Sequence, residues 1–170
     1  MYTTELLARL QTFYLALDKV TRQLEKVHSD RLHCQKGCHA CCTDHLEVFG
    51  IEAAYIQAEC NTFLTSQLPH PKGKCAFLDA AGACRIYNHR PFVCRTHGLP
   101  LRWIEDDLSV DVEYRDICEL NEEGPALETL EKKEVLFTTE WEEYLVKLQF
   151  LADKGKRERV QLRKLFPFAS

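Results

Sequence analysis

Eight of the nine cysteines in this 170-residue chain follow a pattern that could support metal chemistry. Four lie in the segment CQKGCHACC and four follow it; the set is Cys34, Cys38, Cys41, Cys42, Cys75, Cys84, Cys94 and Cys118. Zinc and iron bind the thiolate form of cysteine, and crowded thiolates repel one another unless a cation neutralises them. The sequence therefore predicts that these eight residues are metal ligands.

The spacing leaves open how the eight sulfurs are shared among metal ions. Cys38-x2-Cys41 allows two sulfurs to turn back onto one ion, as in zinc knuckles. Cys41 and Cys42 are adjacent, and neighbouring side chains diverge, so this pair is better suited to two ions or to two irons of one cluster. Two zinc sites of four thiolates each, or a [4Fe–4S] cluster with four further ligands for zinc or a second cluster, use the same residues.

The remaining cysteine and the nearby histidines have separate interpretations. Cys60 is off the motif spacing and lies in a predicted helix, so we expect a buried small apolar side chain. His39, His45 and His89 lie near the cysteines in sequence and are expected outside the coordination shell. His97, three residues after Cys94, is the candidate to replace a cysteine as ligand.

Composition narrows the protein class. Hydrophobic residues make up 45% and charged residues 28% of the chain, a globular balance that argues against disorder. No apolar run approaches the length of a membrane span, and the N-terminal segment lacks a signal-peptide core. Dense thiols in odd number suit metal binding in a reducing compartment better than a secreted disulfide framework. We therefore expect a cytoplasmic protein without a membrane partner.

Charge is unevenly distributed along the chain, whose net charge is −4. Acids outnumber bases between Glu105 and Glu143, whereas the segment KGKRERVQLRK near the C-terminus is basic. A nucleic-acid contact through that segment would use Lys156, Arg157, Arg159, Arg163 and Lys164. Glu158 interrupts the patch and no aromatic stacking set lies beside it, so the sequence argues against nucleic acid. A protein partner or a substrate stays unidentified.

Hydrophobic periodicity predicts the elements that position the cysteines. Apolar residues at spacings of three and four predict a helix over about residues 4–28, ahead of the cysteine loop in which Gly37 permits a tight turn. A second helix is predicted from Ile51 to Leu64 and a small hairpin around residues 79–82. Residues 99–104 and 108–114, joined by three acids, predict another hairpin.

Beyond Gly124-Pro125 the pattern becomes helical again. One helical face carries Trp141, Tyr144, Leu145, Leu148 and Leu151, which we expect in the core, and a further helix is predicted after Gly155. The sequence thus predicts a mainly α, α+β fold in a single domain over residues 1–170. Terminal helices would flank an irregular cysteine-rich metal-binding region with short β-hairpins, residues 34–118, and residues 125–166 would form the C-terminal helical region.

The motifs in which the cysteines lie resemble those of a known family. Cys34-x3-Cys38-x2-Cys41-Cys42, followed by C-R-I-Y-x2-R-P-x2-C-R from Cys84 to Arg95, resembles the YkgJ-type cysteine cluster family, described by the pattern CxxCxxCC. The match covers about half of the chain, Cys34 to Cys118. It implies a zinc- or iron-chelating domain, and a flagellin lysine N-methylase carries a related cluster.

Two functional hypotheses follow. The first is a metal-binding protein that chelates zinc or iron, including iron in an iron–sulfur cluster, through its multi-cysteine cluster. The alternative is an iron–sulfur redox or methyl-transfer enzyme related to flagellin lysine N-methylase. Arg90 and Arg95 are expected to offset thiolate charge or to form surface ion pairs. The sequence indicates no catalytic residue, nucleotide-binding loop or separate cofactor-binding residue, and it leaves enzymatic activity undecided.

Overall fold

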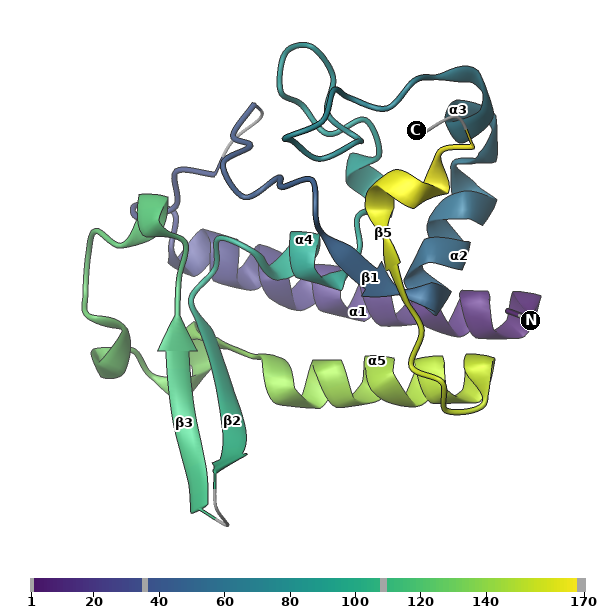
Figure 1. The fold of residues 1–170 in the computed structure, drawn as a ribbon. Coiled ribbons are helices and arrows are strands. Elements are labelled where there is room, and N and C mark those ends of the chain that lie inside the picture. The colour runs from purple at the N-terminus through teal and green to yellow at the C-terminus, as the bar shows by residue number, and fades with distance from the viewer. Residues whose placement is uncertain (1, 35–36, 108–109, 168–170) are drawn as a thin grey trace. The chain divides into compact units, whose positions relative to one another are not determined.

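A computed structural model describes residues 2–34, 37–107 and 110–167 of the chain. The chain divides into two compact units. Unit 1 comprises Met1–Thr12, Gln35–Pro91 and Val146–Ser170, and unit 2 comprises Phe13–Cys34 and Phe92–Leu145. Helices and two small sheets make up the fold, which confirms the predicted α+β class (Figure 1). The expectation of a single domain stays a prediction.

The element bounds are as follows. The helices are α1 (Thr4–Val27), α2 (Gly50–Glu59), α3 (Asn61–Ser66), α4 (Phe92–Thr96) and α5 (Thr138–Asp153). The strands are β1 (Glu47–Phe49), β2 (Leu101–Asp107), β3 (Val110–Asp116), β4 (Leu136–Phe137) and β5 (Arg159–Gln161). Short 3-10 turns cover Tyr87–His89, Glu119–Asn121, Leu127–Thr129, Lys132–Glu134 and Leu162–Leu165. Among the described residues, no helix is both long enough and apolar enough to cross a membrane.

Helix α1 confirms the predicted N-terminal helix almost to the residue. Leu10 and Leu17, seven residues apart and thus two helical turns, are fully buried. Phe13 of the same apolar stripe packs in unit 2 against Phe92 and Trp141, with ring centroids 6.0 and 5.5 Å away. Spacing alone was sufficient to place this element because one face is apolar over its whole length.

Unit 1 is built around a two-stranded antiparallel sheet. Strand β1 pairs with β5, with Val48 opposite Val160. Helix α2 follows β1 directly, and Gln149 accepts a hydrogen bond from the Ile51 N–H at 2.8 Å. The predicted single helix from Ile51 to Leu64 is instead two, because Cys60 has φ −115° and ψ 18°, outside the helical region.

The prediction of a helix after Gly155 is wrong. Strand β5 and a 3-10 turn occupy that part of the described chain. Lys154, Gly155 and Arg157 all have positive φ, between 52° and 87°, which a right-handed helix cannot contain. The Asp153 carboxylate accepts hydrogen bonds from the N–H groups of Gly155 and Glu158, so the polar groups beyond α5 have partners without a helix.

The prediction that one face of α5 lies in the core is only partly correct. Leu145 and Leu148 are buried, as expected. Tyr144 and Leu151, however, expose 45% and 59% of their surface. Tyr144 still contributes by stacking on Phe13 in unit 2, with centroids 5.6 Å apart and planes 7° apart.

Unit 2 contains a three-stranded sheet in the order β3-β2-β4 (Figure 1). Strands β2 and β3 form the predicted hairpin, with Trp103 opposite Tyr114. Strand β2 runs to Asp107, so the three acids expected in the turn belong to the strand, and residues 108–109 lie outside the described residues. Strand β4 pairs with β2 in parallel, with Leu101 opposite Leu136.

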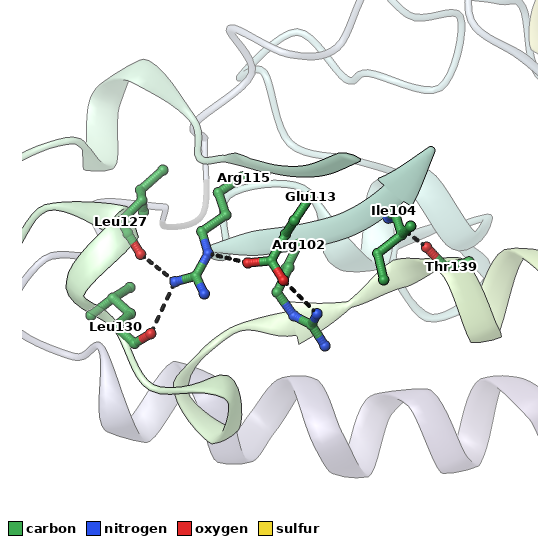
Figure 2. Close-up of polar contacts among 7 residues, drawn as sticks. All are labelled: Arg102, Ile104, Glu113, Arg115, Leu127, Leu130 and Thr139. Carbon is green, nitrogen blue, oxygen red and sulfur yellow. Dashed lines mark hydrogen bonds and ion pairs between the residues drawn. The ribbon is translucent and has the colours of Figure 1, made fainter. Parts of the chain in front are cut away.

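Charged side chains tie this sheet to the turns beside it (Figure 2). The Glu113 carboxylate accepts hydrogen bonds from Arg102 and Arg115, each at 2.9 Å. Arg115 also donates to the carbonyl oxygens of Leu127 and Leu130. The hydrogen bonds from Arg115 and Arg102 hold the pKa of Glu113 below its ordinary value.

Because this pKa is lowered in the folded state, the ionised carboxylate stabilises the fold at neutral pH. That contribution disappears as the pH falls through the folded-state pKa, below the ordinary glutamate value of about 4.3. We expect Glu113→Gln to lower the free energy of unfolding at pH 7, with the difference from wild type vanishing in acid. Urea unfolding of both proteins across this pH range measures it. Other effects of acid are common to both proteins, so their difference isolates Glu113.

Glu123→Gln, at an exposed acid of the same unit, is the control and should change stability little at either pH. A Glu113→Gln deficit that is equal at pH 7 and in acid would contradict the proposed role of the carboxylate charge.

Candidate metal centre

In unit 1, residues 37–42 lie beside the turn that precedes Cys84. Gly37, with φ 92°, makes the tight turn that the sequence predicted, and the His39 ring Nδ1 bonds the Gly37 carbonyl oxygen at 2.8 Å. The same ring rests against Gly82, where a Cβ atom would stand 3.0 Å from Nδ1. The segment carrying Cys38 is therefore packed against the turn before Cys84.

A backbone hydrogen bond joins the same segment to Cys75. The Cys75 N–H donates to the Cys42 carbonyl oxygen at 2.9 Å. Cys75 is buried, Cys38 and Cys42 are half-buried, and Cys41 is exposed. Five of the eight predicted ligands, Cys38, Cys41, Cys42, Cys75 and Cys84, thus come from adjoining segments of one unit.

Cys75 and Cys84 lie on the two arms of a closed turn, as the predicted hairpin around residues 79–82 requires. Leu78 forms an antiparallel bridge with Cys84, and the Arg85 N–H donates to the Phe77 carbonyl oxygen at 2.8 Å. The Asp79 carboxylate accepts from the N–H groups of Ala81 and Ala83, which fixes the tip of the turn.

Cys75 and Cys84 each accept the same type of local hydrogen bond. The Cys75 sulfur accepts from the N–H of Phe77, and the Cys84 sulfur accepts from the N–H of Ile86, in each case two residues further along. Burial raises the pKa of both thiols, and these hydrogen bonds act in the opposite direction because they favour the thiolate. The charge of Arg90 also acts to lower the pKa of Cys84. A metal ion at these sulfurs would therefore displace protons.

An ion pair between Arg163 and Asp44 supports the segments that follow Cys42 and precede Cys75. Arg163 donates to the Asp44 carboxylate, two residues after Cys42, and to the carbonyl oxygens of His70 and Lys74 at 2.7 and 2.9 Å. Asp44 in turn accepts from the Gly73 N–H at 2.9 Å. Although burial acts to raise the pKa of Asp44, the Gly73 and Arg163 hydrogen bonds lower it overall. Arg163 is thus a half-buried residue that joins three segments, whereas the sequence placed it in a basic patch.

Cys60 is buried, with 7% of its surface exposed, as its position in the sequence predicted. Burial raises the pKa of its thiol, and the charge of Cys84 acts in the same direction. Cys60 therefore lies within electrostatic range of a predicted ligand. The sequence spacing gave no indication of this proximity.

In unit 2, Asn121 connects the segments that carry Cys34 and Cys118. Asn121 is fully buried, and its amide Nδ2 donates to the Cys34 sulfur at 3.3 Å and to the Gly98 carbonyl oxygen at 2.8 Å. Its backbone N–H donates to the Cys118 carbonyl oxygen at 2.7 Å. The cysteine motifs did not indicate Asn121, and its place three residues after Cys118 was the only available signal.

Arg90 and Arg95, two of the three arginines of the Cys84–Arg95 motif, have different surroundings. Arg95 forms a buried ion pair with Asp18 of α1, 2.7 Å from both carboxylate oxygens, and stacks over the Tyr14 ring. Arg90 stacks over Tyr87 with its guanidinium 3.6 Å from the ring centre. Arg90 thus has the expected electrostatic effect on a cysteine, whereas the observed ion pair of Arg95 joins α4 to α1.

Across residues 2–34, 37–107 and 110–167, no three His, Cys, Asp or Glu side chains are already arranged as a coordination shell. None of the nine cysteines, all of which are described, forms a disulfide. His97 is exposed, and its role as ligand stays a prediction. The structure thus brings the cysteine-bearing segments of each unit together, while the assignment of individual ligands stays a prediction.

Comparison with known proteins agrees with the cysteine pattern. A family model, CxxCxxCC, described as "Putative zinc- or iron-chelating domain", matches residues 33–118. The match covers half of the chain, and the chain belongs to this family. No curated protein matches the chain, and no solved structure does so either.

The Asp44–Arg163 pair gives a prediction about metal retention. Arg163→Gln removes the guanidinium group that pairs with Asp44 and donates hydrogen bonds to the carbonyl oxygens of the 70–74 loop. The segment after Cys42 and the segment before Cys75 are then no longer joined by this side chain. We expect metal affinity to fall by roughly 10- to 100-fold, the usual effect of losing a residue that supports metal ligands. Competition with a chromogenic chelator measures the change.

Arg159→Gln is the matched control, since Arg159 lies on β5 of the same segment and stacks over the Phe49 ring. It should retain wild-type affinity. Equal metal affinity in Arg163→Gln and wild type would show that the ion pair supports the fold without supporting the metal centre.

Proposed function

We propose that this protein binds zinc or iron through its cysteines, with Cys34, Cys38, Cys41, Cys42, Cys75, Cys84, Cys94 and Cys118 as the ligands. The observation that carries the proposal is the matched pair of sulfur hydrogen bonds at Cys75 and Cys84. Both sulfurs accept a backbone N–H from two residues further on, across one closed turn, next to the segment that carries three more thiols.

The physical argument concerns charge. A hydrogen bond to sulfur favours the thiolate, the form that binds metal, and it fixes the direction of the sulfur lone pairs. Burial of Cys75 and Cys84 opposes ionisation, so the thiolates need a cation to become stable. Zinc and ferrous iron supply that charge. The hydrogen bonds that join Asp44, Arg163 and the 70–74 loop would then support the metal centre, because they fix where the segments carrying Cys42 and Cys75 meet.

Metal identity depends on how Cys41 and Cys42 are used. Four thiolates around one ion suit zinc, whereas an adjacent pair suits two irons of a cluster. Anaerobic purification followed by measurement of iron, zinc and acid-labile sulfide distinguishes these outcomes. A colourless protein containing zinc alone excludes the iron–sulfur form, and a brown protein containing sulfide excludes the zinc-only form.

The same chemistry supports a cytoplasmic location for the protein. Eight thiols poised for metal need a reducing environment, since oxidation to disulfides would remove the ligands. Partners are proposed only in general terms: a protein or substrate that meets the metal centre, with no membrane component.

Ligand substitution tests the proposed metal set directly. Cys→Ser at Cys38, Cys41, Cys42, Cys75, Cys84 or Cys94 should lower bound metal, because a serine hydroxyl replaces a thiolate poorly. Cys60→Ser is the control and should retain metal, with only a modest loss of stability from the changed packing. Elemental analysis of the purified variants is the measurement. Loss of metal from Cys60→Ser as complete as from Cys75→Ser would remove the distinction between ligand and packing cysteines.

Removal of metal should destabilise the cysteine-bearing segments most. Structural zinc contributes on the order of 10 kcal/mol in small zinc-binding peptides, as much as the total stability of many domains. We expect a strong chelator to lower the thermal midpoint, with helical circular dichroism falling less than protection of residues 34–118 from hydrogen exchange. An unchanged midpoint after exhaustive metal removal would contradict a structural role for the metal.

A further inference from the structure

The CQKGCHACC motif is divided between the two units. Cys34 belongs to unit 2, whereas Cys38, Cys41 and Cys42 belong to unit 1. We propose that Cys34 binds metal together with Cys94 and Cys118, separately from the rest of its own motif, and that Asn121 is the positioning residue of this second group. This inference rests on the proposed function, since it divides the same ligands.

Both polar atoms of the Asn121 side chain contact the segment that carries Cys34. Its side-chain oxygen accepts from the His33 N–H at 2.8 Å, and its amide nitrogen donates to the Cys34 sulfur at 3.3 Å. The residue before Cys34 and the Cys34 sulfur are therefore both bound to one fully buried side chain. Such an amide cannot rotate to another partner without leaving buried polar groups unpaired, which is unfavourable.

The segment that follows Cys94 fits against the same sulfur. Helix α4 contains Cys94 and ends at Thr96, and Gly98 follows with φ 100°. A Cβ atom at Gly98 would lie 2.7 Å from the Cys34 sulfur, closer than any side chain tolerates. Glycine is thus required both for the backbone conformation and for the approach of Cys34.

The segment that follows Cys118 is bound by the buried side chain of Arg31. Arg31, three residues before Cys34, donates to the carbonyl oxygens of Asn121, Glu122 and Pro125 at 3.1–3.2 Å. The loop after Cys118 is thereby fixed to the segment that leads into Cys34. Cys34, Cys94 and Cys118 come from three segments of unit 2 that meet at Asn121 and Gly98.

The amide donor has a defined chemical effect at such a centre. An N–H directed at sulfur stabilises the thiolate and fixes its orientation, as at Cys75 and Cys84, but here a side chain supplies the hydrogen bond. Asn121→Asp keeps the oxygen that accepts from His33 and replaces the donor with an acceptor. A carboxylate facing the Cys34 thiolate and the Gly98 carbonyl oxygen repels both, so this variant weakens Cys34 as a ligand and loosens the segment after Cys94.

The first experiment uses the wild-type protein loaded with zinc or iron. Graded chelator removes metal, iodoacetamide labels each cysteine as it becomes reactive, and peptide mass spectrometry identifies the labelled residues. We expect Cys34, Cys94 and Cys118 to become reactive together, at a chelator concentration different from that which exposes Cys75 and Cys84. Labelling of Cys34 in step with Cys38 and Cys41 would overturn the proposed grouping, as would simultaneous exposure of all eight cysteines.

The second experiment concerns Asn121. In Asn121→Asp we expect Cys34, Cys94 and Cys118 to be labelled at roughly 10- to 100-fold lower chelator than in wild type, with Cys75 and Cys84 unchanged. Asn61→Asp, the same substitution at an exposed position of unit 1, is the control. Cobalt-loaded protein gives an independent signal, because its thiolate-to-metal absorption should weaken only in Asn121→Asp. Unchanged labelling and absorption in a folded Asn121→Asp variant would exclude Asn121 as a positioning residue.

The two proposals fail in different ways. Wild-type protein that takes up no metal, and whose eight cysteines are all labelled without chelator, would overturn the proposed function and this inference with it. Wild-type protein that protects its cysteines with metal, but with Cys34 grouped with Cys38, leaves metal binding intact and removes only the division of the motif.

Discussion

Hydrogen bonds from buried side chains to the backbone of irregular segments are the interaction on which the rest of this structure depends. Most of the cysteines lie outside helices and strands, so their segments lack the regular ladders that satisfy backbone polar groups elsewhere. Arg163, Asp79, Asn121 and Arg31 supply the missing partners. Each binds two or more backbone groups, which fixes a loop as firmly as a turn of helix would.

This arrangement explains why a chain of ordinary composition can position so many thiols. A thiolate centre needs ligand segments that approach from several directions, and a small sheet or helix presents side chains along only one or two faces. Loops remove that restriction but cost conformational entropy, about 1–2 kcal/mol for each ordered residue. Multidentate polar side chains offset part of that cost before metal binds, and the metal can supply the remainder.

Helix α1, the β2–β3 hairpin, the turn at residues 79–82 and the buried state of Cys60 could be predicted because their signals are local. Periodicity, turn residues and spacing determine them within a short window. Strand β5 could not, because it depends on pairing with β1 more than 100 residues away and on the positive φ of Lys154 and Arg157. The strand lies in the charged segment KGKRERVQLRK, whose composition by itself suggests an exposed helix end.

The candidate site shows the same division between local and distant information. The family could be predicted from the cysteine motifs, and the eight cysteines stay predicted ligands, whereas the contacts of Arg163 and Asn121 could not be predicted. Arg163 stands in a run of bases, and only its distant partners Asp44, His70 and Lys74 distinguish it from a solvated cation. Asn121 has no charge and no motif, so its contact with Cys34 becomes visible only when residues 87 positions apart meet.

The division of the motif between units gives its spacing a different physical meaning. In a zinc knuckle the gap between cysteines is set by the need to return both sulfurs to one ion. Cys38 and Cys41 both lie in unit 1, whereas Cys34 lies in unit 2, where its sulfur accepts a hydrogen bond from Asn121. Under the proposed grouping, the x3 gap between Cys34 and Cys38 does not have to return their two sulfurs to one ion. A motif that looks continuous in sequence would then carry ligands for two centres, and the tight turn at Gly37 would orient only the second part of it.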